Sequence, residues 1–288
     1  MPRADITQKQ FDEFQFVRRT LLEATAFEER LLLVVENLYE FECELLQLAQ
    51  RYLIWRHPVR SEAMRQRLLL DRRLINLLAI CTLYRDQSAH TVSNVCGKKS
   101  PEFVALDSEK SRLYDCRFGY RFMEALRDHV QHRSLAVKSI TFSNATSESP
   151  EKGGRKFIEV TVVPKISTAA LQSDGEFNSG ILRECLELGE EIDLRGPVRE
   201  YVWTMVEIHN FARGLLKPTF DRALATHKAL TQSFNEALGE TVDGFSVSEI
   251  DDSKAEMPFQ VSHFDNALPD YYHHLLKQEV NTSELRRR

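Results

Sequence analysis

The sequence lacks the short motifs of many common enzyme classes. Its 288 residues contain no P-loop, no GxGxxG, no GxSxG elbow and no HExxH helix. Its five cysteines are scattered, odd in number and without a CxxC pair, so no zinc-finger pattern is present and no disulfide framework is expected. The cysteines are typical of reduced thiols in a cytoplasmic protein. We expect neither a metal nor a cofactor.

Long hydrophobic runs are also absent. No apolar stretch approaches the roughly 18 residues that a membrane span requires, and the first residues are polar and charged. We therefore expect neither a signal peptide nor a membrane segment. The net charge of −5 and the pI near 6.0 argue against a general nucleic-acid coat, so any nucleic-acid contact must be local.

Helical periodicity dominates the first half of the chain. It predicts helices over about 25–55 and 61–92, the first ended by His57-Pro58, and a third from about 102 or 110 to 132. The first helix should bury one apolar stripe: Phe27, Leu31, Val34, Leu38, Phe41 and Leu45.

After about residue 135 the hydrophobic pattern changes from that of a helix to that of a strand. Residues 136–142 and 156–163 are strand-like and flank a polar turn, which predicts a β-hairpin. Helix should return over 181–238, with breaks or kinks at Gly196-Pro197 and Lys217-Pro218. A short strand at 244–250, a helix at 268–277 and a frayed basic tip at 286–288 complete the expectation.

The predicted fold is mainly α, an antiparallel helical bundle with an inserted β-hairpin. We divide the chain into N-terminal bundle helices (1–135), the hairpin (136–166), C-terminal helices that complete the bundle (167–242) and an extension (243–288). A two-domain split near Lys165 also fits the sequence.

The segment Phe122–Arg133, FMEALRDHVQHR, presents Arg127, Asp128 and His132 within six residues. Arg127 falls on a predicted apolar stripe with Leu113, Cys116, Tyr120 and Met123. A guanidinium in such a place should either pair with a carboxylate or face a cleft that binds an anion.

This segment resembles the R-x4-6-H signature of the HEPN family, in which the arginine is commonly followed by Asn, Asp or His. The resemblance implies a helical bundle, and in many members a metal-independent endoribonuclease that acts as a dimer. It also implies a bacterial toxin or phage-defence setting, often beside a neutralising or sensor protein. Other members have lost catalysis and act as scaffolds.

The residue types suit RNA cleavage by the 2′-hydroxyl. His132 can transfer protons near neutral pH, Arg127 can bind phosphate oxygens bidentately, and Asp128 can orient either of them. Arg127 and His132 are about 140° apart on an ideal helix. They therefore converge only if the helix ends between them or if two subunits pool their motifs, which favours a homodimer.

Other candidates remain open. Arg85 with His90 has the same spacing and is the alternative site, whereas Arg222 with His227 is typical of a solvated helix face. Arg73, Asn76 and Tyr84 share one face of the preceding helix and could border a substrate cleft, although an interhelical hydrogen-bond network explains them as well. A local basic zone could contact RNA phosphates: Arg51, Arg56, Arg60, Arg65, Arg67, Arg72 and Arg73.

The competing function is a non-catalytic interaction module within a bacterial defence or regulatory complex. His129 with His132 could start a metal site, but no nearby carboxylate or cysteine completes it. His209 is expected at the edge of the core.

Overall fold

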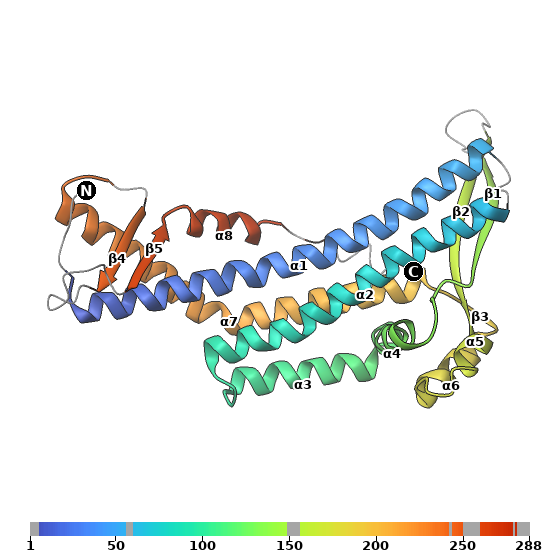
Figure 1. The fold of residues 1–288 in the computed structure, drawn as a ribbon, viewed down its shortest axis with the longest axis horizontal. Helices are drawn as coiled ribbons and strands as arrows, with labels where there is room; N and C mark the ends of the chain where they lie inside the picture. Colours follow the sequence, from blue (N-terminus) through green and yellow to red (C-terminus); the bar gives the residue numbers. More distant parts are fainter. Residues whose placement is uncertain are drawn as a thin grey trace. The chain divides into compact units, whose positions relative to one another are not determined.

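The computed structural model describes residues 6–55, 60–148, 156–241, 244–249, 260–278 and 280. It is mainly helical with an inserted β-hairpin, as the sequence predicts, and its described strands form two small antiparallel sheets (Figure 1). The helices are α1 Gln8–Trp55, α2 Arg60–Cys96, α3 Pro101–Cys116, α4 Phe118–His132, α5 Thr168–Gln172, α6 Ser179–Leu188, α7 Arg195–Leu238 and α8 Leu268–Leu276. None of these described helices combines the length and the apolar character needed to cross a bilayer.

The chain forms two compact units that are not consecutive in sequence. The first contains Met1–Leu31, Ser88–Leu106 and His209–Val280, and most of the second consists of Leu32–Gln87 and Asp107–Ile208. Helices α1, α2 and α7 each contribute to both units. Lys165 lies inside the second unit, so no boundary between the units falls there.

In the second unit, α1 and α2 are antiparallel neighbours. Arg51 pairs with Glu62, while Arg73 pairs with Glu40 and Glu44 nearer the middle of both helices. The helix α1 also pairs with α7, because Glu42 accepts two hydrogen bonds from Arg199. The predicted apolar stripe of α1 is buried, which confirms its orientation towards the core.

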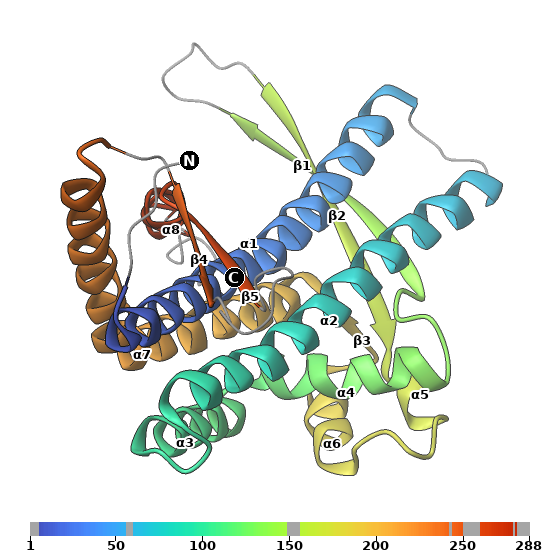
Figure 2. The same cartoon turned by 60° about the vertical axis from the view of Figure 1, so that its left-hand side comes forward.

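The inserted hairpin is confirmed, with longer strands than predicted. Strands β1 (Ser139–Glu148) and β2 (Lys156–Ser167) pair antiparallel, and the unpredicted β3 (Glu191–Asp193) pairs with β2. Stacking of Phe142 on Tyr52, with ring centroids 4.6 Å apart, ties β1 to the end of α1. Figure 2 shows this sheet together with α5, which lies near the C-terminal end of α4, and α6, which lies beside α4.

The first unit has its own core between α1 and α7, built around Phe14, Val17, Leu21, Leu230 and Phe234. The predicted strand near 244–250 is β4 (Gly244–Glu249), and it pairs with the unpredicted β5 (Gln260–Asp265). Helix α8 is close to its predicted range. The predicted basic tip at 286–288 lies outside the described residues.

One prediction about the helices is wrong, because the expected third helix is two helices, α3 and α4, separated at Arg117. Arg117 is extended, with φ −122° and ψ 110°. Its guanidinium donates to Glu207 at 2.6 Å and lies 3.5 Å from the ring centroid of Trp203, both on α7. Contacts with a distant helix therefore stabilise the break.

A second helix prediction also needs correction. The segment predicted as 181–238 is α6, β3 and α7, so the change near Gly196-Pro197 is the start of α7. At Lys217-Pro218 the helix continues, with Pro218 inside α7.

Candidate functional site

Helix α4 carries all three predicted catalytic residues. Tyr120, Phe122, Met123 and Leu126 are buried and attach one face of the helix to the core. Gly119 lies close to α7, since its backbone N–H donates to Glu200 Oε2 at 2.6 Å. Because α3 and α4 are separate helices, the predicted continuous stripe from Leu113 to Arg127 does not exist.

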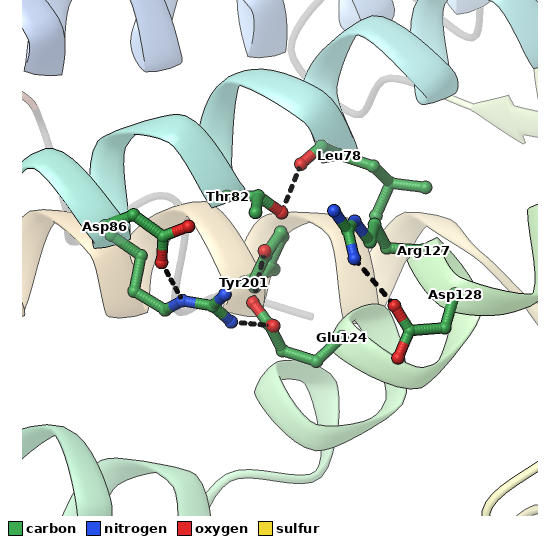
Figure 3. Close-up of polar contacts among 8 residues, drawn as sticks. Leu78, Thr82, Asp86, Glu124, Arg127, Asp128 and Tyr201 are labelled. Carbon is green, nitrogen blue, oxygen red and sulfur yellow. Dashed lines mark hydrogen bonds and ion pairs between the residues drawn. The ribbon is translucent and has the colours of Figure 1, made fainter. Parts of the chain in front are cut away.

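Arg127 lies at the edge of this buried face, with 31% of its side chain exposed. Its Nη1 donates to Asp128 Oδ1 at 2.8 Å, and Figure 3 shows the guanidinium directed towards that carboxylate. The Arg127 Nε is buried and has no hydrogen-bond partner among the described residues. The ion pair therefore joins two of the predicted residues, and about a third of the Arg127 side chain remains exposed beside it.

His132 is exposed and is the last residue of α4. The helix is continuous from Arg127 to His132, so the two side chains point in directions about 140° apart and do not converge within one chain. The sequence allowed two ways for Arg127 and His132 to meet: a helix end between them, or a site shared by two subunits. The bounds of α4 exclude the first.

The alternative pair on α2 is arranged differently. Arg85 forms ion pairs with Glu124 of α4 and with Asp86 at 3.2 Å, and His90 is exposed. Glu124 also accepts a hydrogen bond from the hydroxyl of Tyr201 at 2.6 Å (Figure 3). Burial raises the pKa of Tyr201 well above its usual value and that of Tyr120 to about 12. The carboxylate of Glu124 thus joins α4 to Arg85 of α2 and to Tyr201 of α7.

The three predicted substrate-binding residues do not form one open surface. Tyr84 is 1% exposed and belongs to the core, which corrects its assignment as a groove residue. Arg73 pairs with Glu40 and Glu44, as expected for an interhelical network. Asn76 is exposed. Some arginines of the predicted basic zone also bond to other elements of the fold. Arg51 pairs with Glu62, and Arg67 donates to the Val137 carbonyl at 3.2 Å.

Three of the five cysteines lack the features of activated thiols. Burial raises the pKa of the Cys81 thiol and raises that of Cys185 to about 12, and burial together with Glu102 raises that of Cys96. These three thiols therefore stay protonated near neutral pH. Within the described ranges, no group of three or more His, Cys, Asp or Glu residues could hold a metal ion.

Sequence reasoning missed a polar cluster beside the candidate site. His129, one turn before His132, is buried and contacts Asp174 and Ser134. The His129–Asp174 contact joins residues 45 positions apart, so no local motif reveals it. His209 is fully buried against Glu28, deeper than the expected core edge.

Comparisons with protein-family models, curated proteins and solved structures find no match to this chain.

Proposed function

We propose that the protein is a metal-independent endoribonuclease of the HEPN type, with Arg127, Asp128 and His132 as its site. The ion pairing of Arg127 is the observation that supports this proposal. Neighbouring arginines of the same unit pair with carboxylates on other helices, as Arg85 does with Glu124, Arg117 with Glu207 and Arg121 with Glu184. Arg127 instead pairs with the adjacent and exposed Asp128, and among the described residues no ion pair links it to another helix.

The chemistry assigns one role to each residue. Arg127 would bind the phosphate oxygens and stabilise the charge that develops on them during attack by the 2′-hydroxyl. His132, exposed at the end of α4, would transfer a proton as base or acid. Asp128 would keep the guanidinium oriented until RNA displaces or shares the pair. A homodimer in which each site takes Arg127 from one chain and His132 from the other satisfies the geometry.

The test is cleavage of end-labelled RNA by the purified protein in excess chelator. Wild type should yield 2′,3′-cyclic phosphate ends, and Arg127→Ala should lower the rate by about 10²–10³. His132→Ala should lower it by about 10²–10⁴. Arg112→Ala and His90→Ala are matched controls, since Arg112 is exposed and pairs with Glu109 of its own helix, and His90 is exposed on α2. Both variants should cleave as wild type does.

Two outcomes would contradict this assignment. Loss of cleavage in His90→Ala, with activity kept in His132→Ala, would move the site to Arg85 and His90. Cleavage that requires a divalent metal would exclude the proposed mechanism.

The second candidate function is an interaction module, and the outer face of α1 favours it. Tyr39, Leu46 and Leu53 recur every seven residues on that helix and are all exposed. A seven-residue apolar repeat is typical of a helix that packs against another helix. Absence of cleavage across varied RNAs, with a protein partner lost on Leu46→Glu, would support this function instead.

A further inference from the structure

Three polar side chains near the end of α4 form a connected relay. The His129 Nδ1 contacts Asp174 Oδ2 in the turn after α5, and the His129 Nε2 lies 3.0 Å from Ser134 Oγ. Lys138 Nζ donates to the same Ser134 Oγ at 3.2 Å. All four residues belong to the second unit.

The direction of each hydrogen bond follows from the groups present. An ionised carboxylate can only accept, so Asp174 fixes the neutral imidazole as the tautomer with hydrogen on Nδ1. The Nε2 of His129 then accepts, and Ser134 donates its hydroxyl hydrogen to this nitrogen at 3.0 Å in preference to the Leu135 carbonyl oxygen at 3.4 Å. The ammonium of Lys138 has only donors, so it places positive charge on the Ser134 oxygen.

Burial holds this arrangement in place. The side chains of His129 and Asp174 are 2% and 3% exposed, and the ring of Phe177 packs edge-on against His129 at 6.1 Å. Arg133 holds Asp174 from its other side, with Nε 3.1 Å from Oδ1. Ser134 is half-buried just beyond the helix end.

We propose that Ser134, His129 and Asp174 form a nucleophilic site for carboxylic esters, separate from the Arg127 site. Ser134 Oγ attacks the ester carbonyl, its proton passes to His129 Nε2, and that proton leaves with the alcohol as the C–O bond breaks. Water then attacks the acyl-serine, gives a proton to Nε2, and the serine regains its hydrogen as the acid departs. Asp174 is a positioning residue, and Lys138 stabilises negative charge on the oxygens.

The experiment is labelling of the full-length protein with a fluorophosphonate, in which the Oγ–P bond forms and fluoride leaves. Intact mass and peptide mapping should locate one adduct per chain on Ser134, and Ser134→Ala should abolish it. Ser173→Ala is the matched control, because Ser173 is exposed and adjacent to Asp174, and it should label as wild type does.

Asp174→Asn tests the relay itself. Its amide can donate to Nδ1 and so favours the wrong tautomer, which should slow the maximal labelling rate about 10⁴-fold. The probe concentration that gives half of the maximal rate should stay as in wild type. If Asp174 only maintained the local structure, its replacement would change both the maximal rate and this concentration. Lys138 is exposed, so Lys138→Met does not put folding at risk, and it should slow labelling about tenfold or more.

An adduct on Ser134 that forms equally fast in the Lys138→Met and Asp174→Asn variants would overturn the proposal. Absence of any Ser134 adduct in wild type would do the same, and the relay would then only anchor the end of α4. Neither result depends on RNA cleavage.

Discussion

Gly119 allows α4 to approach α7. A Cβ atom built at this position would lie 2.5 Å from Glu200 Oε2, 2.8 Å from Glu200 Cβ and 3.0 Å from the Pro197 carbonyl oxygen. Backbone and Cβ atoms cannot give way as the end of a flexible side chain can. The glycine therefore sets the separation between the helix that carries Arg127 and the helix that supports it.

Gly119→Ala should lower the free energy of unfolding by about 1–3 kcal/mol, although alanine is the better helix former. Urea denaturation followed by circular dichroism measures this change. Gly214→Ala is the matched control, because Gly214 is exposed within α7 and a Cβ added there would have no neighbouring atom within 4 Å. It should raise stability by about 0.5–1 kcal/mol, and equal effects of the two variants would refute the close-approach argument.

Asp71 contributes to stability through a buried hydrogen bond. Its carboxylate accepts this bond from the backbone N–H of Val137 at 2.8 Å. Burial raises its pKa above the usual value. The stability contributed by this titration is therefore fully present below the ordinary pKa of 3.8 and is lost as pH rises through the folded pKa. At pH 7 the buried negative charge of Asp71 destabilises the fold, whereas its hydrogen bond from the Val137 N–H stabilises the fold.

Asparagine and alanine at position 71 separate these two effects. Asp71→Asn keeps an acceptor for Val137 and removes the charge, so its thermal midpoint at pH 7 should equal or exceed that of wild type. Asp71→Ala leaves the Val137 N–H without its acceptor and should cost about 1–3 kcal/mol. Thermal unfolding at pH 7 distinguishes the two variants, and indistinguishable midpoints would show that the hydrogen bond contributes little.

At the scale of elements, helices were predicted better than their junctions. The burial of Phe27, Leu38 and Phe41 follows from periodicity along a single helix, which the sequence shows directly. The break at Arg117 depends on Glu207 and Trp203, which are about ninety positions away. Strand β3 has only three residues and depends on pairing with β2, so it has no detectable pattern of its own.

In the candidate site, too, contacts between sequence neighbours could be predicted, whereas contacts between distant residues could not. Arg127 and Asp128 are neighbours in sequence, so their ion pair follows from the motif. Asp174 reaches His129 only because α5 and α6 fold back beside α4. The burial of Tyr84 likewise depends on the tertiary packing of α2, which the polar appearance of its predicted face did not reveal.

Helices α1 and α7 are joined in the first unit by a buried charge cluster. Glu28 accepts hydrogen bonds from Arg213 at 2.9 Å and contacts His209 Nε2 at 3.0 Å. Burial lowers the pKa of His209, so its contribution to stability is lost as pH falls below its ordinary value of 6.5. The pKa of Glu28 is lowered despite opposing burial, because His209 and Arg213 hydrogen-bond to it.

Acidification should therefore destabilise the protein in two steps, first below pH 6.5 and again below pH 4.5, the ordinary pKa of glutamate. Urea midpoints measured from pH 8 to pH 4 test this. In His209→Gln the loss between pH 7 and pH 5.5 should shrink, whereas His90→Ala, at an exposed position, should leave it unchanged. Equal slopes in wild type and His209→Gln would show that another group controls this range.

For the whole molecule, the arrangement of charge limits where RNA could bind. The chain is acidic, with a net charge of −5. Several of its arginines are used in pairs between helices, among them Arg73, Arg199 and Arg213. A general electrostatic attraction to phosphate is therefore weak, and the proposed RNA binding would depend on a few positions such as Arg127.

The separation of Arg127 and His132 on one helix makes a further prediction about assembly. If each site combines Arg127 of one chain with His132 of the other, the Arg127→Ala and His132→Ala homodimers are both inactive. A mixed dimer retains one intact site, formed by the unchanged residue of each chain. Random exchange of equal amounts makes half of the dimers mixed, so activity should return to about a quarter of the wild-type rate.

This complementation is measured by mixing the two variants, allowing their subunits to exchange and assaying RNA cleavage in chelator. A double variant, Arg127→Ala with His132→Ala, mixed with wild type at the same total concentration controls for dilution. If Arg127 and His132 of one chain served the same site, no mixed dimer would contain a complete pair. The mixture would then stay as inactive as its components, and the shared site would be refuted even if both residues proved essential.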